Sequence, residues 1–245
     1  MPRTYKAEEM TPAELKQAVE DRPVFILTTG ILEWHGDHLP LGLDVLKMRG
    51  IAERLAERAR AILLPQNWFG VVGYDEMLGT ITFSKGLVKQ IATEFFENLE
   101  KMGAKLVVFL TGHYGPYQVE TITEAADEYM ARSKLRIIAQ PEYEGVDWSQ
   151  CEASPDHADR YETSLAMALF PHLVHMDRFK QEIEIPYEYP YRENPWSFRS
   201  PQGTWRYTCD LREAASPELG EEIIGLIVEH LCQRIDEELA LRPGG

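Results

Sequence analysis

Short, continuously apolar stretches alternate along the chain with longer stretches whose apolar residues recur every three or four positions. The continuous runs are typical of strands covered on both faces, and the periodic stretches are typical of amphipathic helices. The expected strands are 23–32, 61–65, 105–111 and 135–139. The expected helices are 11–20, 44–59, 87–102, 118–132, 162–169 and 218–239. This alternation predicts an α/β fold with a mostly parallel sheet flanked by helices on both faces.

Capping signals mark two of the helix starts. Thr11 precedes Pro12, and Glu14 stands three residues after Thr11, which is the capping-box pattern. Asp44 stands where an N-cap belongs, directly before the apolar residues of the second helix. No Pro/Gly/Ser-rich linker, internal repeat or low-complexity tract divides the chain, so residues 1–245 are expected to form a single domain.

Side chains that can bind metals follow two of the expected strands. Glu33 and His35 come directly after the strand at 23–32, and His113 comes after the strand at 105–111. In open α/β sheets the ligand site lies beyond the carboxyl ends of the strands. We therefore expect these three side chains to meet on one rim of the sheet.

Composition and charge exclude several classes of function. The 245 residues carry 40 Asp and Glu against 25 Lys and Arg, a formal net charge of -15, and no basic cluster suited to nucleic acid. No apolar run is long enough to span a bilayer, and the N-terminal residues lack the apolar core of a signal peptide. The three cysteines are odd in number and far apart, which fits a reducing compartment. The chain is therefore expected to be cytoplasmic.

The spacing of Glu33, His35 and Asp44 is compatible with a metal site. Residues at i and i+2 of an extended segment point to the same side, and the loop before Asp44 is long enough to fold back. Two carboxylates and an imidazole suit zinc, manganese or iron. Taken alone, a Glu-x-His pair at a strand end is more often a solvated edge or a local hydrogen bond than a pair of metal ligands. A further His and carboxylate cluster lies at residues 156–164.

Four motifs, in order along residues 33–164, resemble those of the creatininase (creatinine amidohydrolase) family. Residues 33–44 read E-W-H-G-D-H-L-P-L-G-L-D, close to the family signature E-x-H-G-x-H-L-P-L-G-x-D. Residues 79–82, G-T-I-T, are similar to the family's G-T-I-T/S step. The segments T-G-H-Y-G at 111–115 and H-A-D-R-Y-E-T-S at 157–164 are similar to its third and fourth motifs. The resemblance implies a creatininase-like α/β fold and a homo-oligomer, usually a homohexamer.

The resemblance also implies a site for two divalent metal ions. Carried over position by position, Glu33 and His113 would hold one ion, His35 would hold the other, and Asp44 would bridge them. Glu162 is the candidate for the remaining carboxylate ligand. Zinc is the expected metal, with manganese and iron as alternatives, because mixed His and carboxylate ligation suits all three.

The same resemblance implies roles for two further histidines. His157 would shuttle a proton or contact the substrate, and so with Glu162 it forms the candidate catalytic pair. His38 would fix the loop or orient a ligand without binding the metal itself.

The sequence departs from the family pattern at three positions. In creatininase proper a Glu two residues after the turn histidine can serve as a metal ligand, whereas this chain has Gly115 there. Thr111 replaces the family's Asn, and Asp159 replaces a Gly. The second ion is then expected either to use Glu162 or to be held more weakly. Creatinine itself becomes a doubtful substrate.

Residues 185–207 are rich in aromatic rings and prolines. Two interpretations stay open for this segment. It can be a surface excursion that packs on a neighbouring subunit, or a lid over a small polar substrate, since rings with polar tips suit such ligands.

The family resemblance predicts hydrolysis of a small molecule, in which a metal-bridging hydroxide attacks a carbonyl carbon and the C–N bond of a cyclic amide or a formamide breaks. One alternative is a hydrolase that opens a cyclic keto-sugar by inosose-type C–C cleavage. Another is a non-catalytic metal-binding assembly protein. No nucleic-acid or membrane partner is expected.

Overall fold

The computed structural model describes residues 4–75, 77–149, 151–184 and 204–241. Its centre is a sheet of four parallel strands in the order β2-β1-β3-β4. The strands are β1 (Val24–Thr29), β2 (Ile62–Leu63), β3 (Leu106–Thr111) and β4 (Arg136–Pro141). β1 and β3 run in register over their whole length, from Val24 beside Leu106 to Thr29 beside Thr111. The carboxyl ends of the two central strands therefore lie side by side, and the predicted parallel sheet is confirmed.

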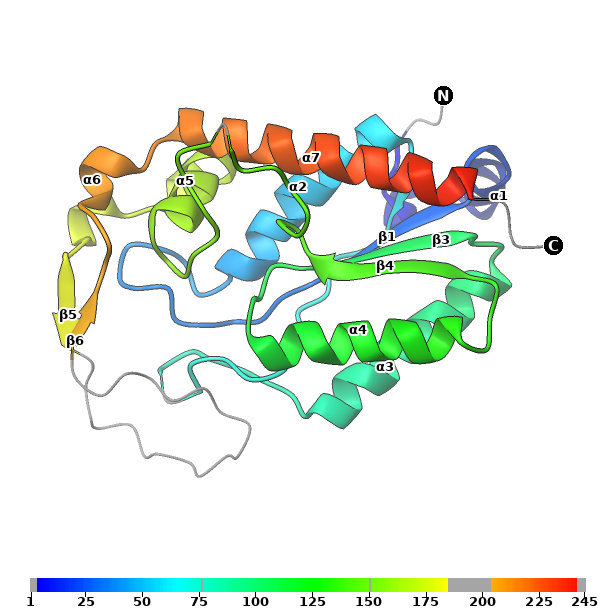
Figure 1. Ribbon diagram of the computed structural model, residues 1–245, viewed down its shortest axis with the longest axis horizontal. Coiled ribbons are helices and arrows are strands. Elements are labelled where there is room, and N and C mark those ends of the chain that lie inside the picture. Colours follow the sequence, from blue (N-terminus) through cyan, green and yellow to red (C-terminus); the bar gives the residue numbers. More distant parts are fainter. Residues whose placement is uncertain (1–3, 76, 150, 185–203, 242–245) are drawn as a thin grey trace.

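Helices cover both faces of this sheet, as predicted (Figure 1). On one face lie α2 (Leu43–Ala59), α5 (Arg160–Leu169) and α7 (Pro217–Ala240), and on the other lie α1 (Pro12–Asp21), α3 (Lys85–Lys101) and α4 (Pro116–Met130). Because successive residues of a strand point to opposite faces, the continuous apolar runs supply both cores at once.

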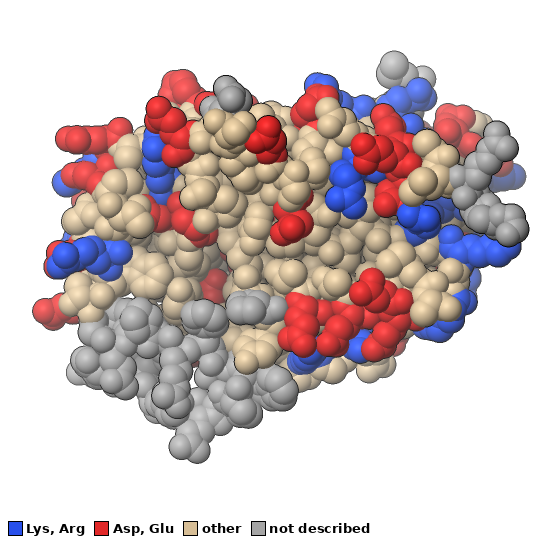
Figure 2. Space-filling view, viewed as in Figure 1, with Lys and Arg blue, Asp and Glu red and all other residues tan. Residues whose placement is uncertain are grey.

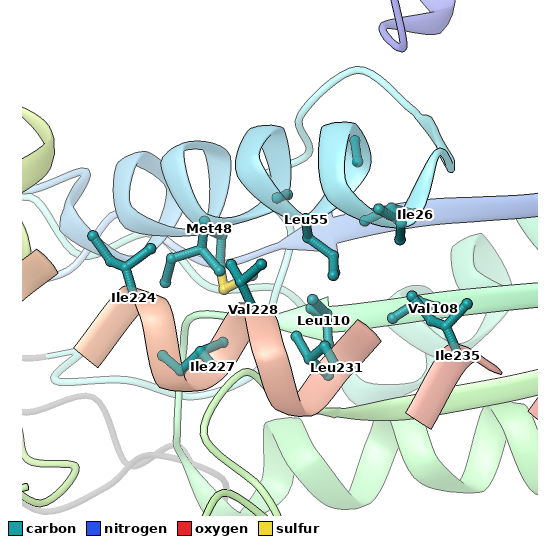
Figure 3. Close-up of a cluster of buried hydrophobic side chains, with 14 of the residues drawn as sticks. Ile26, Met48, Leu55, Val108, Leu110, Ile224, Ile227, Val228, Leu231 and Ile235 are labelled. Carbon is teal, nitrogen blue, oxygen red and sulfur yellow. The ribbon is translucent and has the colours of Figure 1, made fainter. Parts of the chain in front are cut away.

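Each face has its own buried core. Ile26 and Val108 point toward α2 and α7 and pack with Leu55 and Ile227 (Figure 3). Their neighbours on the strands, such as Phe109, pack on the opposite side against α3 and α4. The loops that follow β1 and β3 are thus anchored by strands that are buried on both faces.

Two elements begin or end at other residues than the sequence indicates. The expected strand 23–32 ends at Thr29, after which the chain leaves the ladder. The expectation that Asp44 is an N-cap is wrong: Gly42 is the N-cap of α2, with no side-chain cap, and Asp44 lies inside the first turn. Its carboxylate faces two histidines and accepts from the backbone N–H of Ile31 at 3.4 Å, so it does not cap its own helix. The capping box of α1, by contrast, is present, with Thr11 N donating to Glu14 at 2.7 Å.

Several short elements have no counterpart in the sequence prediction. They are the antiparallel pair β5 (Glu182–Glu184) and β6 (Thr204–Arg206), the helix α6 (Leu211–Ala214), and 3-10 turns at Ala7–Glu9, Pro171–Leu173 and Met176–Arg178. The pair β5–β6 and α6 lie at the end of the molecule away from α1 (Figure 1). Of the ring-rich segment 185–207, residues 185–203 lie outside the described part of the chain.

Acidic and basic side chains are interspersed over much of the face seen in Figure 2, with a row of acidic side chains near α4. On α4, Glu124 and Glu128 form ion pairs with Lys85 and Lys89 of α3. No helix within the described ranges is both long enough and apolar enough to cross a membrane.

Candidate metal centre

The candidate ligands converge at the carboxyl ends of β1 and β3, the rim that the sequence indicates. Glu33 and His35 lie in the loop after β1, His113 follows β3, and Asp44 lies in the first turn of α2. Glu162 enters from the first turn of α5. All five side chains are buried, and none of these residues is more than 5% exposed. Segments that are far apart in the sequence thus meet in one cluster.

The five side chains form two groups of three that share Asp44. In the first triad, His113 Nδ1 lies 3.3 Å from Glu33 Oε2 and 3.5 Å from Asp44 Oδ2. In the second triad, His35 Nε2 lies 3.2 Å from Asp44 Oδ1 and 3.6 Å from Glu162 Oε2. Each oxygen of Asp44 therefore faces a different triad, which is the arrangement of a carboxylate that bridges two cations.

The imidazoles are oriented by hydrogen bonds to backbone carbonyls. His35 Nδ1 donates to the carbonyl of Glu33 at 3.0 Å, and His113 Nε2 donates to the carbonyl of Val72 at 2.6 Å. The other nitrogen of each ring then faces the cluster, where it would donate a lone pair to a metal ion once it has released its proton. Among the described residues, His35 Nε2 is buried and has no hydrogen-bond partner. This orphaned donor, surrounded by carboxylate oxygens, fits a metal ion.

Charge is balanced between the carboxylates and the imidazoles. Burial by itself would raise the pKa of Asp44, but the neighbouring rings of His113 and His35 hold that pKa well below its ordinary value. Burial would likewise lower the pKa of His35, yet Asp44 and Glu162 raise it to about 9. Protons on the imidazoles thus supply positive charge that divalent cations would otherwise supply. Binding of a cation would release these protons.

Glycines allow this close approach of the loops. A Cβ at Gly30 would lie 2.7 Å from Cβ of Asp44, and one at Gly112 would overlap the carbonyl oxygen of Asp44. At Gly115 a Cβ would lie 2.8 Å from His113 Nε2 and 3.1 Å from the carbonyl oxygen of Val72. A Glu at position 115, as in the family pattern, would therefore have to displace the His113 ring and the backbone at Val72. Of the two expectations for the second ion, the geometry favours the one that uses Glu162.

Two charged residues of the cluster were missed in the sequence. Lys47 is fully buried, forms an ion pair with Glu162, lies 3.7 Å from Glu142 and donates to Tyr114 Oη at 2.6 Å. Tyr114 in turn donates to Glu142, which is also fully buried. The spacing of Lys47 could have indicated that it is buried in the cluster. It falls three residues after Asp44, on the face of the helix that buries apolar residues.

A cavity of about 260 Å³ opens on the cluster. Its lining includes Glu33, Asp44, His113, His157 and Glu162. His157 Nε2 donates to the carbonyl of Trp34 at 2.9 Å, so Nδ1 is left as the bare nitrogen, 3.9 Å from Glu33 Oε2. His157 thus stands beside the triads as a group able to accept or return a proton.

Aromatic rings form one side of this region. The Trp205 ring lies 5.4 Å from Trp34, 5.7 Å from Tyr74 and 5.7 Å from His157, measured between ring centroids. Trp205 belongs to the ring-rich segment, so the described end of that segment lies at the site. His38, by contrast, belongs to neither triad: it is buried between Phe179 and Tyr207, with Nε2 3.2 Å from Thr163 Oγ1. This position is consistent with the structural role expected for it.

Comparison with known protein families gives one match that spans most of the chain. Residues 8–235 match the creatininase family model, described as creatinine amidohydrolase. A creatinine amidohydrolase of Pseudomonas putida is 27% identical over 88% of this chain and 89% of its own length. A mycofactocin precursor peptide peptidase of Mycolicibacterium smegmatis is 28% identical over 61% of this chain and 59% of its own length. A 3-dehydro-scyllo-inosose hydrolase of Thermotoga maritima is 23% identical over 69% and 58%.

Solved structures share the fold over nearly the whole chain. A creatininase crystal structure superposes with a TM-score of 0.78 at 24% identity, covering 97% of this chain and 99% of the other. A creatininase with manganese has a TM-score of 0.74 at 24% identity, covering 97% and 100%. A mutant creatininase of the Zn-Zn type has a TM-score of 0.73 at 23% identity, covering 97% and 99%. The creatininase-like fold is therefore confirmed.

Proposed function

The chain belongs to the creatininase family of metal-dependent hydrolases, and from this premise we propose that it is an amidohydrolase acting on a C–N bond of a small cyclic amide or a formamide. The observation that carries the proposal is Asp44, whose two oxygens face two separate buried triads. A site for two ions that share one carboxylate is the arrangement that hydrolytic centres use.

The first triad, Glu33, Asp44 and His113, would hold one divalent ion, and the second triad, His35, Asp44 and Glu162, would hold the other. Zinc is the first choice and manganese or ferrous iron are alternatives, because imidazole and carboxylate ligands suit all three. Creatininases with manganese and of the Zn-Zn type support the first two. When bound, such ions would lower the pKa of water and polarise a carbonyl group.

The chain's own residues would bind the substrate and move the proton. Nδ1 of His157 faces the cluster and would take a proton from the attacking water and return it to the leaving nitrogen. The hydrogen bond from Nε2 to the carbonyl of Trp34 holds the ring in this tautomer. The rings of Trp34, Tyr74 and Trp205 would pack on the substrate and exclude bulk water.

The choice of a C–N bond is supported by the names of the relatives. The Pseudomonas putida protein is a creatinine amidohydrolase and the Mycolicibacterium smegmatis protein is a peptidase, so both act on C–N bonds. A cavity of about 260 Å³ favours a small molecule over a long peptide. Gly115, at the position of a family metal ligand, argues for a substrate other than creatinine.

The decisive experiment combines metal analysis with a substrate panel. Purified protein, reconstituted with Zn²⁺ or Mn²⁺, is analysed for bound ions and assayed with creatinine, lactams, formamides and keto-inositols. We expect two ions per chain and hydrolysis of an amide, and we expect Asp44→Ala to lose both. Asp37→Ala is the matched control, because Asp37 lies exposed in the same loop. A protein that binds no divalent ion, or an Asp44→Ala variant with full activity, would rule the proposal out.

A second candidate is a hydrolase that opens a cyclic keto-sugar, favoured by the similarity to the Thermotoga maritima inosose hydrolase. Turnover of keto-inositols alone in the same panel would establish it. A non-catalytic metal-binding assembly protein is the remaining alternative, and a single ion with a closed tetrahedral ligand set and no turnover would favour it. The homo-oligomer, a hexamer by family resemblance, stays a prediction that light scattering tests.

A further inference from the structure

Lys47 is an unusual component of this cluster. A lysine is almost never fully buried unless it is paired, and Lys47 has no exposed surface. Its ammonium group contacts Glu162, lies 3.7 Å from Glu142 and sits 3.9 Å from the centre of the Tyr114 ring. Lys47 does not line the cavity, so it would not touch a substrate there. Its effect has to be transmitted through Glu162 or Tyr114.

The two oxygens of Glu162 have different partners. Oε1 accepts from Lys47 Nζ. Oε2 accepts from the backbone N–H of Ala158 at 2.7 Å and lies 3.6 Å from His35 Nε2, inside the second triad. Ala158 adopts a φ of 56, in the left-handed region that a non-glycine residue seldom occupies. The carboxylate is therefore held at both ends, with only one oxygen turned toward the second triad.

We propose that Lys47 is a positioning residue that reserves one oxygen of Glu162, so that only the other oxygen is offered to the ion of the second triad. This inference rests on the proposed function, since it presumes that the second triad binds a divalent ion. It assigns a role to a residue outside the two triads and outside the cavity.

The physical reason lies in the number of ligand positions. A carboxylate can bind a cation through one oxygen or through both. Hydrolytic ions need a position left open for water, whereas structural ions are closed by protein ligands. If the ammonium group were absent, Glu162 could bind the ion with both oxygens and fill that position. An ammonium group repels a cation, so removal of the Lys47 charge is not expected to lower the affinity of the second triad for its ion.

The test is Lys47→Met, which keeps an unbranched side chain of similar length and removes the charge. Cobalt(II) replaces the native ions as a spectroscopic probe, because its visible absorption weakens as more ligands surround it. We expect the variant to bind as many ions as the wild type and to show a weaker cobalt absorption. We expect kcat to fall at least tenfold with a smaller change in KM. Lys85→Met, the same change at a surface lysine that forms ion pairs on α4, is the control.

A double variant, Lys47→Met with Glu142→Gln, guards against misfolding, because it removes the opposite buried charge as well. It should show the same change in cobalt absorption. Wild-type absorption and kcat in a folded Lys47 variant would overturn the inference. Loss of the second ion would also overturn it, because Lys47 would then be required for the second triad to bind an ion at all. Failure of the proposed function is distinguishable, because in that case the wild-type protein would itself bind fewer than two ions.

Discussion

Asp44 and Lys47 lie three residues apart on α2, and both side chains point into the same buried cluster. Residues at this spacing share one face of a helix, so one helix turn delivers both the shared carboxylate and a fixed positive charge. Burial alone would lower the pKa of Lys47, but Glu162 and Glu142 hold it above its ordinary value. These two carboxylates therefore favour the charged form of Lys47.

The two triads predict different results for the two ring ligands. His35→Ala removes a ligand from the second triad alone, and His113→Ala removes one from the first triad alone. Each variant should therefore retain one tightly bound ion per chain, whereas Asp44→Ala should retain none. Metal analysis after dialysis against a weak chelator measures this. Loss of both ions from either single variant would show that the triads do not bind independently, and retention of two ions would show that the ring removed is not a required ligand.

His157 is expected to affect turnover and not metal content. Its Nδ1 faces the cluster from 3.9 Å, farther than the closest contacts within either triad. His157→Gln should therefore keep both ions and lower kcat by roughly 10²- to 10⁴-fold, the usual contribution of a proton-transfer group. Metal analysis and steady-state kinetics on the same preparation test this. A variant that loses an ion would instead identify His157 as a ligand.

Much of the sheet could be predicted from the sequence because its strands are buried on both faces. The run at 105–111 corresponds within one residue to β3, Leu106–Thr111, since an uninterrupted apolar segment has few other stable positions. The strands β5 and β6 escaped prediction because each has three residues with exposed ends and no apolar run. The helix α3 begins at Lys85 and not at the expected residue 87, because Ser84 serves as its N-cap.

The candidate ligand set could be predicted only in part. Glu33, His35 and His113 were placed by their position after strands, Asp44 by the loop that precedes it, and Glu162 by family resemblance. The contact of Lys47 with Glu162 joins residues 115 positions apart in the chain, and local spacing carries no information about such a contact. Asp44 was expected in the cluster. The further expectation that it caps α2, which rests on the usual role of an Asp before a helix, was wrong. Here Gly42 is the N-cap of α2, and the Asp44 carboxylate contacts the two histidines of the cluster.

Gly115 predicts that the missing family ligand cannot simply be restored. A side chain there would meet His113 Nε2 and the carbonyl oxygen of Val72, so Gly115→Glu should destabilise the protein by about 1–3 kcal/mol. Gly115→Glu should also lower the affinity of the first triad for its ion, because it displaces the His113 ring. Urea unfolding and metal titration measure the two effects. Gly86→Ala is the control, since a Cβ there meets nothing within 4 Å. A Gly115→Glu variant with unchanged stability and tighter ion binding would contradict the prediction.

Glu142 predicts a pH-dependent stability in the metal-free protein. Burial raises the pKa of this carboxyl to about 7 from its ordinary value of 4.5, although Lys47 opposes the shift. The folded state therefore holds the proton more tightly than the unfolded state, so the protonated carboxyl favours folding below about pH 4.5 and that contribution is lost as the pH rises through 7. Glu142→Gln cannot lose a proton, so its stability relative to the wild type should rise by up to about 3 kcal/mol between pH 4.5 and 8. Urea unfolding of chelator-treated wild type and variant across this range gives the difference. A constant difference at every pH would show that Glu142 titrates alike in both states.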